Sequence, residues 1–179
     1  MENKIRCAWC EKDDLYRNYH DNEWGKPVYD DETIFEFLIL ETFQAGLSWY
    51  TVLAKRENFR KAFDNFDLMK IANYSEDKMD ALAEDAGIIR NKLKIKATVT
   101  NAQAFIKVQE EFGSFSKYIW GFVDGKPIDN KPKTLNEVKA TTPISDALSK
   151  DLKKRGFKFV GSTVMYAHMQ ATGMVNDHI

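Results

Sequence analysis

The sequence is poor in cysteine and carries almost no net charge. Only two cysteines occur among its 179 residues, Cys7 and Cys10, and they lie close together. Such a pair does not build the disulfide framework of a small secreted protein, and it fits a metal site or a redox pair better. The net charge of −1 and the pI of about 6.3 exclude a protein that coats nucleic acid by bulk charge, although a local basic patch remains compatible with them.

Long apolar runs are absent as well. No run is long enough to span a bilayer, and residues 1–6 lack the apolar core of a signal peptide, so we expect a soluble, cytoplasmic protein with no membrane partner. Hydrophobic residues still make up 44% of the chain, enough to bury a core. The length predicts one domain over residues 1–179, or two small lobes that share a core.

Alternating runs typical of β-strands are also missing. Residues 157–160 alternate, but this segment is short and lies between two glycines. Capping residues and glycines instead divide most of the chain into helices, and the stretch 124–139 resembles a linker. We expect helices to start at Asp30 or Asp31, Ser48, Ser75 and Thr142, and to end near Gly46, Gly87, Gly113, Gly156 and Gly173. The helix that starts at Ser48 should run toward Phe63. The predicted fold class is all-α, a compact bundle of several helices.

The most apolar of these predicted helices ends in a carboxylate. Residues 34–40 are apolar except for Glu36, and Glu41 follows them directly. Burying such a group is costly unless it has a partner or a task.

Aromatic residues are dense in the same third of the chain. They are Trp9, Tyr16, Tyr19, Trp24 and Trp49. Rings of this kind stack on a flat base and attract a positively charged one, whereas the alternative interpretation is simple packing between helices.

Residues 82–96 predict a helix, a tight turn and a second helix. Gly87 in the turn permits a positive φ, and backbone N–H groups there and at the next helix start could cradle a phosphate. Positive charge follows at Arg90, Lys92, Lys94 and Lys96. The pattern resembles a helix–hairpin–helix motif that holds a DNA backbone without reading its sequence. The alternative is an ordinary helical hairpin with a solvated basic helix.

A metal site could join the two ends of the chain. The thiolates of Cys7 and Cys10 and the imidazoles of His20 and His178 suit tetrahedral zinc, and a structural ion would pin segments that otherwise fray. Their spacing is not that of a standard zinc finger, so packing without a metal is the alternative. We expect His168 to be a packed or partly exposed side chain and not a ligand.

At these residues the sequence resembles the bacterial 3-methyladenine DNA glycosylase I family over nearly all of its length. The resemblance rests on segments 6–9, 19–25, 44–49, 55–59, 87–90, 146–150, 153–161 and 175–178. It implies an all-helical, helix–hairpin–helix repair enzyme. Such an enzyme flips N3-methyladenine out of double-stranded DNA and hydrolyses the N-glycosidic bond, leaving an abasic site.

The resemblance also implies roles for individual residues. Glu41 would be the pocket carboxylate that reads the base, and Trp49 the platform on which the base stacks. The residues that would line or close the pocket are Trp9, Tyr16, Tyr19 and Trp24. Gln44 and Leu47 would probe or fill the gap left in the duplex. The residues that would hold phosphates are Gly87, Ile88, Ile89, Arg90 and Lys92.

The zinc ligands implied by the resemblance are incomplete. Cys7, His20 and His178 match three of the family's four ligands, but the fourth, a cysteine after the last histidine, has no counterpart in the sequence. Cys10 could substitute for it, because two residues separate it from Cys7, which is a common chelating spacing.

One absence bears on the expected chemistry. Many helix–hairpin–helix glycosylases carry a catalytic aspartate after the hairpin, but no aspartate occurs between Ala86 and Val123. A cationic base already leaves easily as a neutral purine, so we expect specificity and rate to come from the pocket.

Two other functions remain as alternatives. One is a non-catalytic, zinc-pinned module that recognises damaged DNA. The other is an enzyme acting on free bases or nucleotides, which would have no use for a duplex clamp. A monomer is the default expectation, and 3-methyladenine is the lesion that the resemblance implies.

Overall fold

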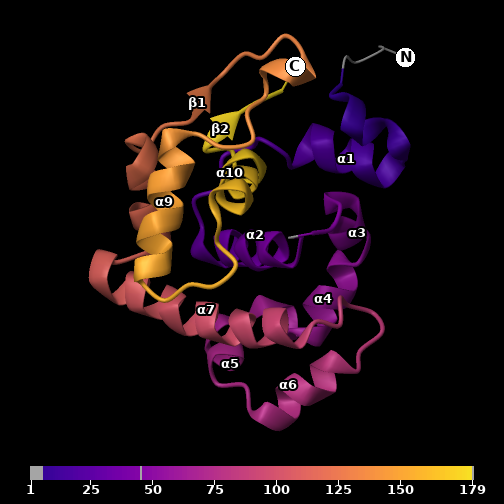
Figure 1. The fold of residues 1–179 in the computed structure, drawn as a ribbon, viewed down its shortest axis with the longest axis vertical. Coiled ribbons are helices and arrows are strands. Elements are labelled where there is room, and N and C mark those ends of the chain that lie inside the picture. The colour runs from indigo at the N-terminus through magenta and orange to yellow at the C-terminus, as the bar shows by residue number, and fades with distance from the viewer. Residues whose placement is uncertain (1–5, 45, 179) are drawn as a thin grey trace.

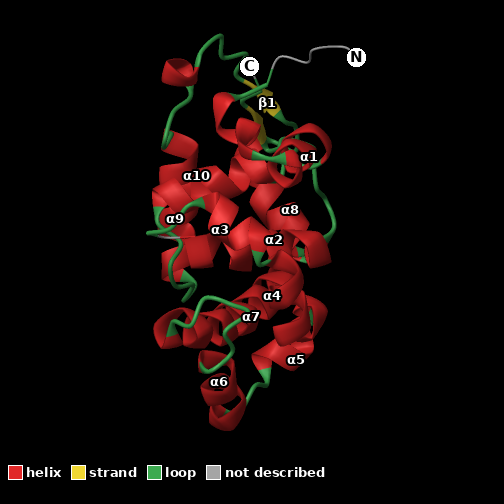
Figure 2. Cartoon of the chain, turned by 90° about the vertical axis from the view of Figure 1, so that its right-hand side faces the viewer, coloured by secondary structure: helices red, strands yellow, loops and turns green. Residues whose placement is uncertain are grey.

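The computed structural model describes residues 6–44 and 46–178, and most of them are helical (Figures 1 and 2). The α-helices are α1 (Asp14–Asn22), α2 (Asp31–Gln44), α3 (Trp49–Ala54), α4 (Arg56–Ala62), α5 (Leu68–Ala72), α6 (Glu76–Ala83), α7 (Lys92–Phe112), α8 (Phe115–Trp120), α9 (Pro143–Lys154) and α10 (Ser162–Ala171). The 3₁₀ turns are η1 (Ala8–Lys12), η2 (Asp64–Phe66), η3 (Gly121–Val123) and η4 (Leu135–Glu137). None of the helices in the described ranges is long and apolar enough to cross a membrane.

The predicted all-α fold is confirmed as a predominantly helical one, with a small correction. Two short strands, β1 (Ile128–Asp129) and β2 (Val175–Asn176), pair in parallel, with Ile128 opposite Val175. They lie beside the C-terminal end of the chain in Figure 1. Each strand has only two residues, which is too short for an alternating pattern to appear in the sequence.

Helix α2 forms the centre of the fold. It packs against α3, α7, α8 and α10, and Figure 1 shows it between α10 and α7. The side chains from Phe37 through Phe43 are all buried. A helix that is apolar on every side is stable only when neighbours cover it completely. The polar residue near its end, Glu41, is therefore buried together with the apolar ones.

The predicted helix starts follow local hydrogen bonds. The backbone N–H of Thr33 donates to Asp30 Oδ2 at 2.9 Å, and Ser48, Ser75 and Thr142 each accept a backbone N–H in the first turn of the next helix. Of the predicted stops, Gly46, Gly113, Gly156 and Gly173 have the expected positive φ.

Two predicted helix ends are wrong. The helix expected to run from Ser48 toward Phe63 is interrupted at Lys55, which divides it into α3 and α4. Helix α6 ends at Ala83, several residues before the expected stop at Gly87.

The C-terminal segment returns to the first third of the chain. The backbone N–H groups of Gly25 and Val28 donate to the carbonyls of Gln170 and Thr172 at 3.0 and 2.9 Å. A Cβ at Gly173 would lie 2.4 Å from backbone atoms of Lys26, so only glycine permits this approach. The contact brings residues near both ends of the described chain together.

His168 is a packed side chain, which is one of the two environments predicted for it. Its side chain is completely buried on α10, and neither ring nitrogen has a hydrogen-bond partner among the described residues. Burial lowers the pKa of this imidazole to about 4, so the ring is neutral at physiological pH.

Candidate functional site

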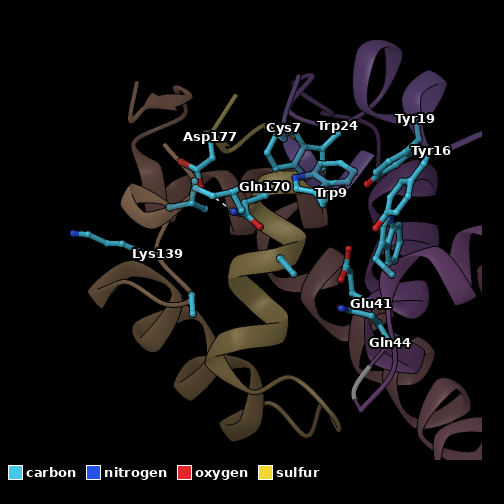
Figure 3. A pocket seen from close by; sticks show the side chains of 15 residues that line it. Cys7, Trp9, Tyr16, Tyr19, Trp24, Glu41, Gln44, Lys139, Gln170 and Asp177 are labelled. Atoms are coloured by element: carbon cyan, nitrogen blue, oxygen red, sulfur yellow. Dashed lines mark hydrogen bonds between the residues drawn. The ribbon is translucent and has the colours of Figure 1, made fainter. Parts of the chain in front are cut away.

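A cavity of about 370 Å³ lies beside the C-terminal half of α2 (Figure 3). The elements around it are η1, α1, α3, α10 and the segment 135–140. The residues that line it are Cys7, Trp9, Tyr16, Tyr19, Trp24, Glu41, Gln44, Trp49, Leu135, Val138, Lys139, Ala140, Ala167, Gln170 and Asp177. The structure therefore brings together in one cavity Glu41 and all five aromatic residues singled out in the sequence.

Glu41 is buried in the wall of this cavity without a compensating charge. Its side chain is 2% exposed, and Oε2 has no hydrogen-bond partner in the described ranges. Burial raises the pKa of this carboxyl group from its ordinary 4.5 to about 8. The group is largely protonated at pH 7, and a cation placed beside it would favour its ionised form.

A second buried carboxylate in the cavity is, by contrast, fully bonded. Asp177 accepts hydrogen bonds from Asn130, Tyr166 and Gln170 at 2.7, 2.6 and 2.9 Å. Its oxygens are thus committed to holding the C-terminal segment. Of these two carboxyl groups, Glu41 is the one whose oxygen is left for a ligand.

Aromatic rings surround the space above Glu41. Ring centroids are 4.9 Å apart for Trp9 and Tyr16, and 5.7 Å apart for Tyr19 and Trp49. Tyr16 and Tyr19 share one face of α1 because they are three residues apart. Figure 3 shows both phenols pointing toward Glu41.

Two of these rings carry a buried hydrogen-bonding group that has no partner among the described residues. The Tyr19 hydroxyl and Trp49 Nε1 are buried and have no partner among residues 6–44 and 46–178, and the same holds for Glu41 Oε2. Buried polar groups are normally bonded, so a group of three unpartnered ones in one cavity fits a flat ligand with donors and acceptors at its edge.

Gln44 and Leu47 lie at the edge of the cavity. Gln44 lines both the cavity and a neighbouring groove, and that groove also contains Leu47 together with Thr163 and Val164 at the start of α10. Leu47 is 40% exposed. Its position outside the cavity suits contact with a second surface.

The turn between α6 and α7 has a different geometry from the expected one. Gly87 does not adopt a positive φ; a Cβ there would lie 3.3 Å from Asn58 Cβ, so the glycine permits a close approach of two segments. Ile88 is buried in the core, and only its backbone can face a ligand. Arg90 and Lys92 are exposed.

Two of the predicted metal ligands are adjacent. The ring centroids of His20 and His178 are 4.8 Å apart. His20 Nδ1 lies 3.0 Å from Asp21 Oδ1, and its Nε2 is buried with no partner in the described part of the chain. The Cys10 thiol donates to the carbonyl of Cys7 at 3.1 Å. Among the described residues, no group of three or more histidine, cysteine, aspartate or glutamate side chains is placed to hold a metal ion.

The sequence did not predict the outer wall of the cavity. Leu135, Val138 and Lys139 come from the stretch 124–139, interpreted as a linker, and Ala140 follows it directly. Figure 3 shows the Lys139 side chain extending away from Glu41. This stretch therefore contributes to the cavity mainly by passing along its outer side. Nothing in a polar, proline-containing segment signals which distant helix it will cover.

Comparison with known proteins agrees with this arrangement. Residues 9–179 match the methyladenine glycosylase family. This chain belongs to that family. It is 50% identical to DNA-3-methyladenine glycosylase 1 of Escherichia coli (strain K12), over 97% of this chain and 93% of the relative.

Solved structures of the family superimpose closely. A crystal structure of 3-methyladenine DNA glycosylase I gives a TM-score of 0.95 at 50% identity, covering 98% of this chain and 96% of that chain. A variant of 3-methyladenine DNA glycosylase I, solved in complex with 3-methyladenine, gives a TM-score of 0.94 at 37% identity, covering 97% and 94%.

The buried carboxyl group predicts a pH-dependent stability. Because the pKa of Glu41 is raised in the folded protein, the neutral form favours folding below pH 4.5, and this contribution is lost as the pH rises through about 8. Relative to the wild type, Glu41→Gln should gain on the order of 4 kcal/mol of unfolding free energy between pH 4.5 and 9. Urea unfolding at several pH values measures this gain, and Glu32→Gln, an exposed change on the same helix, is the control. A constant difference between Glu41→Gln and the wild type would contradict the burial of an unpaired carboxyl group.

Proposed function

We propose that this protein is a DNA repair glycosylase that excises N3-methyladenine from alkylated DNA and leaves an abasic site. The observation that carries the proposal is the unpartnered Glu41 carboxyl group inside a cage of tryptophan and tyrosine rings. Membership of the methyladenine glycosylase family and the complex of a relative with 3-methyladenine support the same substrate.

The charge of the substrate explains why the pocket is built this way. An N3-alkylated adenine in DNA carries a formal positive charge, and its glycosidic bond breaks readily because the base departs as a neutral purine. Glu41 would ionise beside this cation and accept a hydrogen bond from the base, while the Trp49 ring stacks on its face. Neutral adenine offers no charge to compensate the buried carboxylate, so the pocket would favour the alkylated base.

Extrusion of the base requires contacts outside the pocket. Swinging a nucleotide out of the duplex costs roughly a few kcal/mol. Leu47, exposed at the mouth of the cavity, would fill the gap left in the base stack, and Gln44 would contact the pairing partner. The α6–α7 turn would act as a helix–hairpin–helix motif, with backbone groups of residues 87–89 and the side chains of Arg90 and Lys92 on phosphates.

Release of free base from methylated double-stranded DNA tests the function directly. Chromatography should detect 3-methyladenine after incubation with the wild-type protein. Glu41→Gln should lower the single-turnover excision rate on the order of 100-fold, because it removes the charge that stabilises the cationic base. Its affinity for abasic DNA should remain near that of the wild type, and Glu32→Gln should excise normally.

Two outcomes would contradict this assignment. Excision by Glu41→Gln at the wild-type rate would show that the carboxylate does not act on the base. Tight binding of damaged DNA by the wild type without any released base would favour the non-catalytic alternative.

The backbone clamp predicts a change in salt dependence. Arg90→Ala should weaken binding to damaged and undamaged duplex equally, and it should reduce the slope of log affinity against log salt by about 1. Fluorescence anisotropy over a salt series measures both quantities. Lys107→Ala is the control, because it removes an exposed charge on α7 about 22 Å along the helix from Lys92. An unchanged slope for Arg90→Ala would show that the duplex backbone binds away from Arg90.

We also propose that a structural zinc ion is held by Cys7, His20 and His178. The support is the His20 ring, whose Nδ1 faces the Asp21 carboxylate while its buried Nε2 lacks a partner in the described ranges, as in many histidine ligands of zinc. His178 would have to turn, because its nitrogens lie 2.8 Å from Asn176 Oδ1 and 3.3 Å from the His20 carbonyl. The ion would pin the C-terminal segment to α1 and take no part in the chemistry.

Metal analysis of the purified protein tests this proposal. The wild type should contain about one zinc per chain, and His20→Ala should lose it together with thermal stability. Cys10→Ser decides whether Cys10 completes the ligand set: unchanged zinc affinity would rule it out. A wild-type protein purified in zinc-containing medium without bound zinc would overturn the proposal.

A further inference from the structure

Lys94 is a buried cation in an unfavourable position. It lies in the first turn of α7, and its side chain is only 6% exposed, unlike the neighbouring Lys92 and Lys96. A positive charge at the start of a helix opposes the helix dipole, and burial adds a desolvation cost that lowers the pKa of this ammonium group. The sequence grouped it with the basic residues that follow the turn, and the structure keeps it there but buries its side chain.

The compensating interaction comes from another helix. Lys94 Nζ donates a hydrogen bond to the carbonyl oxygen of Phe43 at 2.8 Å. Phe43 lies in the last turn of α2, where carbonyl groups lack partners within the helix and the dipole is negative. The last turn of α2 carries no basic residue of its own. Lys94 therefore supplies the cation that this helix end lacks.

This hydrogen bond joins two parts of the proposed machinery. In the sequence, Phe43 stands between Glu41, which lines the pocket, and Gln44 at the edge of the pocket. Lys94 follows directly after the α6–α7 turn, and its backbone N–H is bound by the side chain of the α7 cap, Asn91. A movement of the α6–α7 turn would be transmitted to the last turn of α2, and the reverse, through this short, buried and charge-assisted hydrogen bond.

We infer that Lys94 is a positioning residue that couples the seating of the duplex backbone on the α6–α7 turn to the orientation of Glu41 in the pocket. The inference rests on the proposed glycosylase function. It assigns Lys94 no contact with phosphate or base, which distinguishes it from Arg90 and Lys92.

A comparison of binding with excision tests this role. Lys94→Met keeps an apolar side chain of similar length and removes the charge. Its affinity for abasic duplex should stay within about twofold of the wild type, with the same salt slope, because no phosphate contact is lost. Its single-turnover excision rate at saturating enzyme should fall at least tenfold. Lys107→Met, an exposed change on the same helix, should alter neither quantity.

A double variant separates positioning from a general loss of structure. If Lys94 acts through Glu41, then Lys94→Met combined with Glu41→Gln should excise no more slowly than Glu41→Gln alone, since residues that act as a unit are not additive. Where Lys94→Met does not fold, Lys94→Gln carries the same comparison, and the same separation of binding from excision is expected.

The outcomes distinguish this inference from the function it rests on. A wild-type protein that releases no 3-methyladenine overturns both. An active wild type with Lys94→Met excising at the wild-type rate overturns the positioning role alone. Loss of duplex affinity in step with excision would make Lys94 a DNA contact, and multiplied losses in the double variant would make it a structural residue only.

Discussion

A carboxyl group that is kept out of water must carry a proton or find a cation. Helix α2 imposes this condition on Glu41, because packed neighbours bury the C-terminal half of the helix and leave this residue only 2% exposed. The protein does not provide the cation; Oε2 has no partner in the described structure. The ligand has to provide it, and a positively charged base is a ligand of that kind. Selectivity then follows from the missing positive charge beside Glu41, and not from the shape of the pocket alone.

The rings that complete the pocket belong to a different part of the core. Cys7, Tyr16, Tyr19 and Trp24 form a second buried cluster, separate from the large one around α2 and α7. This cluster packs against the C-terminal segment: the Trp24 and His178 rings are 4.6 Å apart, and a Cβ at Gly25 would lie 2.5 Å from the His178 ring. The aromatic cage therefore depends on how the two ends of the chain are joined, which is a reason to place a structural metal there.

Local features of this fold were predictable from sequence, whereas features set by tertiary contact were not. The cap at Ser48 and the stop at Gly46 depend on one or two residues, and both are confirmed. The burial of Glu41 followed from an apolar run too long to face water. Lys94 could not be distinguished from its exposed neighbours, because its burial depends on the end of α2, far away in sequence. For the same reason, the sequence did not show that Gly87 permits a close approach to Asn58, because Asn58 lies on α4.

The outer wall of the cavity differs from the rest of the site in how it is built. Segment 135–140 contributes no residue to either buried cluster, and most of its side chains face water. Sequence changes there cost little folding free energy, whereas changes in α2 or α1 disturb the core. Divergence or laboratory selection can therefore reshape the entrance of the cavity while the inner end, where Glu41 lies, stays unchanged. Variation in the accepted bulk of the alkyl group would arise first in this segment.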